Sequence, residues 1–259
     1  MLSPAPPLFM YWMNHSVASN FVDLVNQGCI EFVQANPDNF LSFATISMQT
    51  PSLAIKQLDE AMKHPELIGI EIGASIEGNS LDDPNYYEIF DMCESSDWPI
   101  FIHPYYVGNK QGMKNYYMTN LIANPLDTTV AATSLIFGGI LDKYPKLKII
   151  LAHGGGYLPY QIGRLDKGYK VRKECDTCIR KPSEYLSRFI YDSITFNPNS
   201  LEFLIKDVSL DNVVIGTDYP FDMSETAPVE LIESVVPNQL DLMKFGIELV
   251  KNKTTGQNI

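Results

Sequence analysis

Six short apolar runs recur along the chain, and each is followed by polar or turn residues and then by a helical pattern. The runs are LSFATISM (41–48), LIGIEIG (67–73), WPIFIH (98–103), LKIILAH (147–153), RFIYDS (188–193) and NVVIGTD (212–218). They are nearly unbroken in Val, Ile, Leu and Phe, which is typical of strands that are covered on both faces. Their alternation with helical segments predicts an α/β protein with a parallel sheet.

The segments between the runs carry apolar residues at three- and four-residue spacing, which indicates helices. We expect helices over 16–36, 52–64 and 128–144. Successive strands lie about 35 residues apart along the chain, which suits βα units of roughly 30 or more residues. No internal repeat or linker divides the chain, so we expect a single domain over residues 1–259.

Two parallel α/β folds fit this pattern. An open doubly wound sheet usually has a glycine-rich first turn, and no GxGxxG follows any of the six runs. A (β/α)8 barrel needs eight strands, of which six are visible. A chain that begins late would explain the shortfall, because about two βα units, on the order of 70 residues, would complete a barrel.

Composition narrows the class of protein. The chain has 19 Lys plus Arg against 31 Asp plus Glu, a net charge of −12, and such a charge repels nucleic acid. Four cysteines in 259 residues do not form a disulfide framework, and no charged start followed by a long apolar run suggests export. No stretch approaches the ~20 apolar residues that span a bilayer. We therefore expect a cytoplasmic protein with neither nucleic-acid nor membrane partners.

Polar residues end three of the apolar runs. His103 ends WPIFIH, His153 ends LKIILAH and Asp218 ends NVVIGTD. In parallel α/β folds the functional site forms at the carboxyl ends of the strands. One such histidine alone is more often a hydrogen-bonded structural residue, but two histidines and an aspartate together have the composition of a divalent metal site. His15 and His64 fall at helix ends, where we expect them to be solvated.

The segment AHGGGYLPYQIGR carries three glycines directly after His153. Glycines let the backbone pass close to a ligand and begin a helix whose amide groups face an anion, although a plain tight turn explains them equally well. The four arginines, at 164, 172, 180 and 188, are surface charges by default. Arg164 or Arg172 could instead bind a carboxylate.

Read in order, these residues resemble the decarboxylase branch of the amidohydrolase superfamily. The matching segments are IFIHPYY, the stretch from MKNYYMTN through AHGGG to GYKVR, and VVIGTDYPFDM. They span most of residues 40–224. The motifs HP, AHGGG and GTDYPF in this order are a specific signal, whereas any one of them alone would be weak.

The resemblance implies a distorted (β/α)8 barrel, here lacking about its first two βα units, with one catalytic Zn²⁺. It also implies non-oxidative loss of CO₂ from a small conjugated carboxylate such as aminocarboxymuconate semialdehyde. In that family pattern His103 is a metal ligand, Asp218 a second ligand that also contacts water at the metal, and His153 the acid/base that deprotonates this water. Arg172 matches an arginine that binds a substrate carboxylate across a homodimer interface. Mn²⁺ suits similar ligands.

One departure from the family pattern is serious, because the family supplies two more metal ligands from an HxH pair that this chain lacks. Two protein ligands are fewer than the three that a catalytic zinc normally has, so we expect weak metal binding by the chain as given. The tail FGIELVKNKTTGQNI also departs from the family's helical ending. Three functions stay open: a metal-dependent decarboxylase, a hydrolase of the same superfamily, and an inactive truncated homologue.

Overall fold

The computed structural model describes residues 1–105 and 112–237. The strands are β1 (Ser42–Ala44), β2 (Leu67–Gly73), β3 (Ile100–His103), β4 (Ile149–Leu151), β5 (Phe189–Asp192) and β6 (Val213–Val214). The α-helices of these residues are α1 (His15–Ala35), α2 (Pro51–Ala61), α3 (Tyr87–Ser95), α4 (Asn124–Phe137), α5 (Ile140–Lys143), α6 (Leu158–Val171), α7 (Pro198–Val208) and α8 (Pro228–Val235). Shorter helical turns are η1 (Pro6–Leu8), η2 (Pro84–Tyr86), η3 (Thr119–Ala123), η4 (His153–Gly155), η5 (Lys173–Cys175), η6 (Pro182–Arg188) and η7 (Leu210–Asn212).

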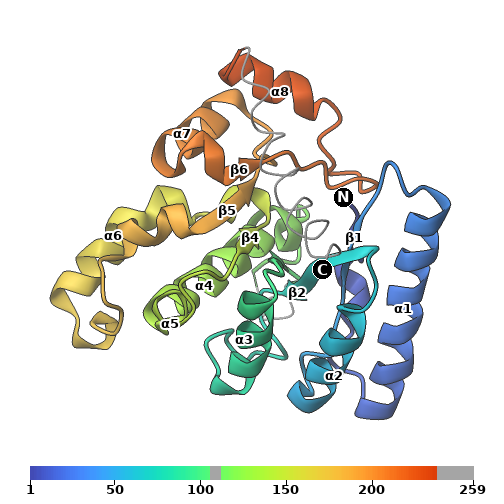
Figure 1. Ribbon diagram of the computed structural model, residues 1–259. Coiled ribbons are helices and arrows are strands. Elements are labelled where there is room, and N and C mark those ends of the chain that lie inside the picture. The colour runs from blue at the N-terminus through green and yellow to red at the C-terminus, as the bar shows by residue number, and fades with distance from the viewer. Residues whose placement is uncertain (106–111, 238–259) are drawn as a thin grey trace.

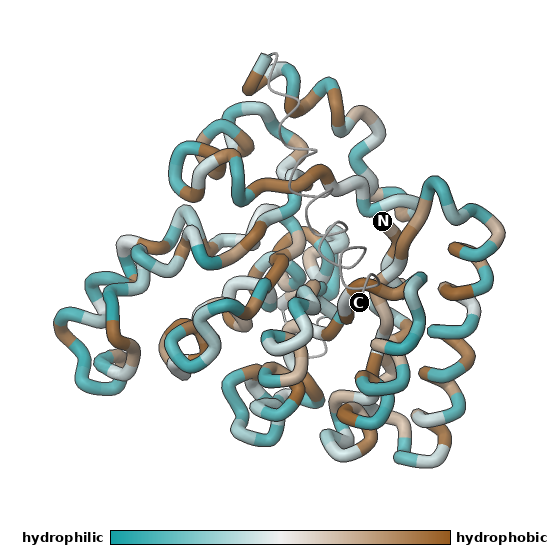
Figure 2. The backbone as a smooth tube through the Cα atoms, in the orientation of Figure 1, coloured by the Kyte–Doolittle hydropathy of each residue, from teal (hydrophilic) through white to brown (hydrophobic). Residues whose placement is uncertain are grey.

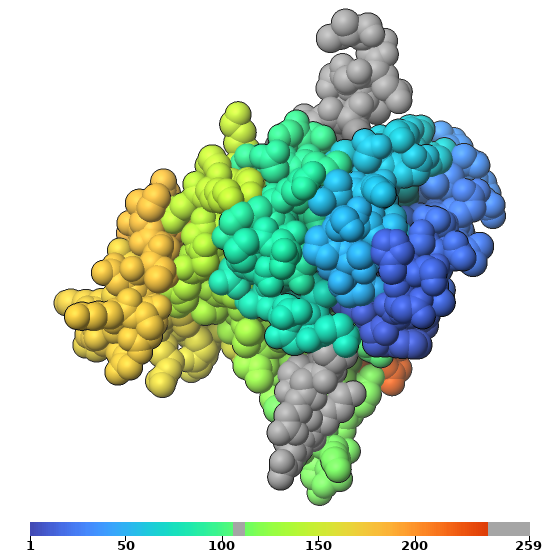
Figure 3. Space-filling view, turned by 90° about the horizontal axis from the view of Figure 1, so that it is seen from below, coloured from blue at the N-terminus to red at the C-terminus, as the bar shows by residue number. Residues whose placement is uncertain are grey.

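The six strands form one parallel sheet in which each strand pairs with the next one along the chain (Figure 1). Seen from below, the chain passes in sequence order from blue to yellow across the molecule, so that successive βα units lie side by side (Figure 3). This order is that of a barrel, not of a doubly wound sheet. Within the described residues, however, no ladder joins β6 to β1. Instead, Leu2 forms a parallel bridge to Ser42 along the outer edge of β1.

All six apolar runs contain a strand, which confirms the predicted parallel α/β sheet. The helices expected over 16–36 and 52–64 are α1 and α2. The single helix expected over 128–144 is wrong, because α4 ends at Phe137 and α5 begins at Ile140. Gly139 between them has a φ of 70°, a left-handed conformation that a right-handed helix cannot continue.

The helices cover one face of the sheet and bury its alternate residues. Isoleucines 70, 72, 100 and 149 and Leu151 are at most 1% exposed and belong to a core cluster that extends along the chain from Phe9 to Ile232. Apolar colour gathers on the strands and on helix sides that face them (Figure 2).

Two expectations from the sequence involve residues 238–259: that the whole chain is a single domain, and that its tail departs from the family's helical ending. Both concern residues outside the described ranges and stay predictions.

The opposite face of the sheet carries a second, smaller apolar cluster. Its members are the neighbouring strand residues Phe43, Phe101, Ile150, Ile190 and Val214. They alternate along the strands with the residues that face the helices, so they fill the interior around which the sheet curves. This smaller cluster packs beneath the carboxyl ends of the strands. None of the helices in residues 1–105 and 112–237 combines the length and the hydrophobicity that a membrane-spanning helix needs.

Glu71 is the exception to this apolar filling. It lies between Ile70 and Ile72 on β2 and therefore faces the interior, where it is 0% exposed. Neither carboxylate oxygen has a partner in hydrogen-bonding geometry. Burial raises the pKa of Glu71 well above its ordinary value; the nearby Ser3 side chain opposes this shift, and the negative charge of Asp218 adds to it. Burial therefore favours the neutral acid over the carboxylate.

Glu71→Gln should change the pH dependence of folding stability. A carboxyl whose pKa is higher in the folded chain than in the unfolded chain holds an extra proton when folded. Wild-type stability therefore falls as the pH rises above the unfolded value of about 4.3. Because Gln does not titrate, the variant should gain Tm relative to wild type between about pH 5 and about pH 8. Thermal unfolding at both pH values measures this gain.

Glu88→Gln on α3 is the matched control, since Glu88 is exposed and the same charge is removed. Its Tm should follow that of wild type at both pH values. Parallel pH profiles for wild type and Glu71→Gln would contradict a raised pKa for the buried acid.

Candidate active site

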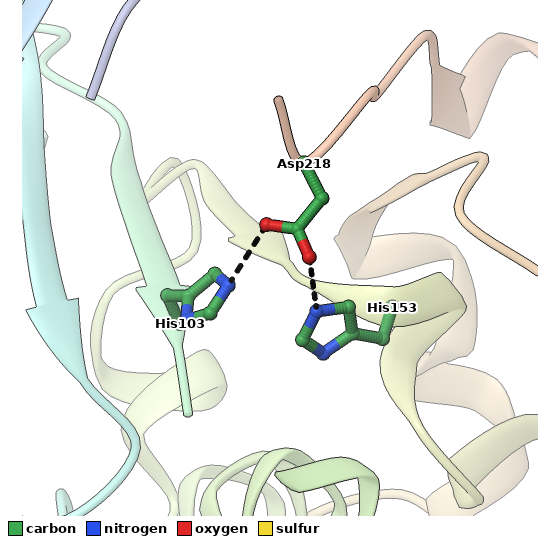
Figure 4. Close-up of side chains that lie close together, drawn as sticks. All are labelled: His103, His153 and Asp218. Atoms are coloured by element: carbon green, nitrogen blue, oxygen red, sulfur yellow. Dashed lines mark ion pairs between the residues drawn. The ribbon is translucent and has the colours of Figure 1, made fainter. Parts of the chain in front are cut away.

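The structure brings His103, His153 and Asp218 together at the carboxyl edge of the sheet (Figure 4). His103 is the last residue of β3, His153 begins the turn η4 after β4, and Asp218 follows β6. Each residue offers a ligand atom within 4.8 Å of those of the other two. The convergence follows from the parallel arrangement, in which all carboxyl ends meet at one edge.

The Asp218 carboxylate lies between the two imidazoles. Its Oδ1 is 3.9 Å from Nε2 of His103, and its Oδ2 is 3.8 Å from Nε2 of His153. The three side chains are only 12%, 15% and 17% exposed, in the order His103, His153, Asp218. Both separations exceed a hydrogen bond, so the carboxylate faces both rings without closing onto either.

His103 is held as a neutral base. Its Nδ1 lies 2.9 Å from the carbonyl oxygen of Pro104, so the neutral ring donates its Nδ1–H there and presents the Nε2 lone pair to Asp218. Burial and the charge of His153 lower the pKa of His103 to about 3, although Asp218 and the Pro104 carbonyl oppose this shift. A lone pair that faces a carboxylate is an unfavourable pair unless a cation lies between them.

His153 has the opposite electrostatic character. Burial by itself lowers its pKa, but the carboxylates of Asp218 and Asp192 outweigh burial and raise the pKa above the ordinary value. Its Nδ1 is buried without a hydrogen-bond partner. Two neighbouring imidazoles whose pKa values are pushed apart suit two different roles, one as a ligand and one as a proton carrier.

These residues fit a divalent metal ion. A neutral imidazole nitrogen and a carboxylate oxygen are donors that both Zn²⁺ and Mn²⁺ accept. His103 Nε2 and an Asp218 oxygen would hold the ion, which would remove the unfavourable contact between lone pair and carboxylate. The carbonyl of Pro104 orients the His103 ring from behind, as outer partners of metal-binding histidines commonly do.

The backbone is left-handed at two of the three residues. The φ angles of His153 and Asp218 are 57° and 56°, which is uncommon for residues other than glycine. The glycines after His153 pack closely: a Cβ at Gly155 would meet the Tyr191 ring at 2.6 Å, and one at Gly156 would meet the Pro125 carbonyl oxygen at 2.1 Å. The glycines therefore allow the turn to pack against β5 and α4.

Sequence reasoning missed Asp192, the last residue of β5. Its carboxylate accepts hydrogen bonds from the backbone N–H groups of His153 and Gly154, both at 2.8 Å. Burial raises its pKa, although His153 and these N–H groups oppose that shift. The rule that singled out His103 also applies to RFIYDS, so the signal for Asp192 was present at a strand end.

A cavity of about 560 Å³ opens beside His153 and Asp218. Leu121, Ile194, Phe196, Phe203 and Met223 give it an apolar lining. Neutral polar groups from Asn120, Thr195, Asn199 and Ser200 are spread among them. Its size and mixed lining suit a small organic molecule.

The remaining candidate residues lie away from this cavity. Arg172 directly follows the last residue of α6; its side chain is 65% exposed, and its guanidinium donates a hydrogen bond to Glu174. Arg164 lies within α6 and is also exposed. His15 is exposed, and His64 is partly exposed beside Glu60. Within one chain, Arg172 therefore does not reach the site.

Comparison with known proteins places the chain in a family. An amidohydrolase family model matches residues 6–241. The chain is 35% identical over 237 residues to 2-amino-3-carboxymuconate-6-semialdehyde decarboxylase from Dictyostelium discoideum, covering 91% of this chain and 66% of that protein. It thus spans just under two thirds of the length of this curated relative.

Solved structures agree on the fold. The crystal structure of 5-carboxyvanillate decarboxylase from Sphingomonas paucimobilis superposes with a TM-score of 0.84 at 25% identity, over 95% of this chain and 75% of that one. A dihydroxybenzoic acid decarboxylase from Polaromonas with bound manganese superposes with a TM-score of 0.83 at 24% identity, over 98% of this chain and 81% of that one. The expected amidohydrolase-type barrel fold is confirmed. The chain belongs to the amidohydrolase family.

Proposed function

We propose that this chain acts as a metal-dependent, non-oxidative decarboxylase, a carboxy-lyase, on a small conjugated carboxylate such as aminocarboxymuconate semialdehyde. The observation that carries the proposal is the convergence of His103, His153 and Asp218 beside a cavity with an apolar lining. The 35% identical relative is named as a decarboxylase of that semialdehyde, and the two solved structures are named as decarboxylases of aromatic acids.

The residues divide the work by their electrostatics. His103 Nε2 and Asp218 are the proposed metal ligands, and a bound Zn²⁺ or Mn²⁺ would polarise the oxygens of the substrate. The lining of the cavity holds the conjugated body of the substrate and excludes water from it. Asp218 also supports the charge of a protonated His153, whose Nε2 lies 3.8 Å from it.

Proton transfer from His153 is the first step of the proposed reaction. His153 is the proposed acid/base: the carboxylates that raise its pKa favour the form that carries a proton at Nε2. The proton moves to the substrate carbon that bears the carboxylate and forms a C–H bond there. The C–C bond to the carboxylate then breaks, CO₂ leaves, and the electron pair of that bond returns to the conjugated system.

The finer assignments complete this proposal. Zn²⁺ is the proposed metal, with Mn²⁺ as the alternative that the manganese in the Polaromonas structure supports. Arg172 is the proposed substrate-binding arginine, and since it lies outside the cavity of its own chain, it would act in a homodimer. The cytoplasm is the proposed compartment, which the four free cysteine thiols support.

The product identifies the reaction. We expect the chain, reconstituted with Zn²⁺ or Mn²⁺, to release CO₂ and to remove the absorption of the conjugated substrate. Elemental analysis of the same sample measures bound metal. Opening of a lactone or amide with a new carboxylate would favour a hydrolase instead. A metal-loaded chain that catalyses neither reaction would favour an inactive homologue.

Variants of His153 and Asp218 test the division of roles. His153→Asn should lower kcat by about 10² to 10⁴, the range that general acid–base catalysis contributes, and should leave bound metal unchanged. Asp218→Ala should lower both kcat and bound metal, because a ligand is lost. Equal loss of metal in the two variants would argue against the assignment.

Arg172→Ala should raise KM for a dicarboxylate substrate and change kcat little, since a carboxylate contact that is equally strong in the ground state and the transition state contributes to binding alone. Lys173→Ala, a neighbouring surface charge, is the matched control. An unchanged KM in Arg172→Ala would remove this arginine from the site.

A further inference from the structure

The carboxylate of Asp192 is placed directly beneath the turn that carries His153. Asp192 ends β5 and is 4% exposed. In the β4–β5 ladder Leu151 pairs with Tyr191, so Asp192 is level with the residue just before His153. Like Ile190, it faces the interior of the curved sheet.

One side chain ties two loops together. Oδ2 of Asp192 accepts the His153 N–H at 2.8 Å, and Oδ1 accepts the Gly154 N–H at 2.8 Å and the Ile194 N–H at 3.0 Å. All three lengths are those of good hydrogen bonds, and bonds to a carboxylate are about twice as strong as neutral ones. The turn after β4 is thereby joined to the loop after β5.

These contacts show what the backbone N–H groups at the start of the glycine turn bind. Successive N–H groups in such a turn form a concavity that binds an anion. Here the anion is the protein's own Asp192, so the N–H groups of His153 and Gly154 are already engaged and are not a substrate site. The turn is left-handed at both residues, with φ of 57° and 59°, and this conformation is unfavourable for an L-residue such as His153.

We propose that Asp192 is the positioning residue of the site: by binding the backbone of His153 and Gly154 it holds the left-handed turn that places the His153 imidazole beside Asp218. Without these bonds, the His153 backbone would relax toward negative φ and turn its Cα–Cβ bond away from Asp218. Only the use of the His153 proton rests on the proposed function. The placement of the ring does not.

Asp192→Asn is the main test, because it keeps the shape of the side chain while it removes one acceptor and the negative charge; Asp192→Glu below keeps the charge and so isolates the effect of the hydrogen bonds. The readout is the imidazole ¹⁵N spectrum of the metal-free chain, whose four histidines are few enough for His153→Asn to assign the His153 signals. We expect Asp192→Asn to shift or broaden the His153 signals and to leave those of His103 in place. In the metal-loaded chain, kcat should fall by about 100-fold at unchanged metal content, as a misplacement of about 1 Å can cause.

Thr129→Val is the matched control at the other end of the same turn. It removes the 2.8 Å bond from the Tyr157 N–H to the Thr129 hydroxyl and does not touch His153. The His153 signals and kcat should match wild type. The same changes in Thr129→Val as in Asp192→Asn would show general loosening of the turn and overturn the proposal.

Asp192→Glu covers the case in which Asp192→Asn does not fold, since it keeps the charge and moves the carboxylate by one methylene. It should also displace the His153 signals. Wild-type signals in a folded Asp192 variant would overturn the proposal. A chain that releases no CO₂ would contradict the proposed function, while the spectra would still decide the role of Asp192.

Discussion

The site depends on a contact that is unfavourable by itself: the carboxylate of Asp218 faces the unprotonated Nε2 of His103 at 3.9 Å. The Pro104 carbonyl fixes the ring tautomer, and burial keeps the ring neutral, so the imidazole cannot relieve the contact by taking up a proton. A divalent cation would turn the same arrangement into a favourable one. The chain therefore holds its two donors in the form that a metal requires.

His153 and His103 lie close together, but their surroundings suit them to two different roles. It shares Asp218 with His103 and is similarly buried, yet its pKa rises while that of His103 falls. After the opposing effect of burial, Asp218 is the largest influence on the pKa of His153 and raises it, and the second carboxylate, Asp192, which lies under His153, raises it further. The charge of His153 in turn lowers the pKa of His103. Asp192 thus acts on His153 twice, through the hydrogen bond to its backbone and through its negative charge.

The side chains that lie beneath the site differ in polarity from strand to strand. On β3, β4, β5 and β6 the layer below the polar edge is apolar and packed. On β2 the same layer holds the acid Glu71, neither of whose carboxylate oxygens has a partner in hydrogen-bonding geometry. The neighbouring strand, β1, pairs with β2 on one side and forms the bridge to Leu2 on the other. Glu71 therefore places a buried acid on the strand next to β1, while the neighbouring strands carry apolar side chains in this layer.

The strands, their parallel arrangement and the residues at their ends could be predicted from the order of the residues, because burial on both faces leaves continuous apolar runs and a polar residue marks where each run stops. His103, His153 and Asp218 could be chosen by this rule. It did not fix the break of the helix at Gly139, the surface position of Arg172 or the partner of the glycine turn. These depend on which backbone groups and side chains meet across the fold. Asp192 lies 39 residues from His153 along the chain, and only the β4–β5 ladder brings its carboxylate under that turn.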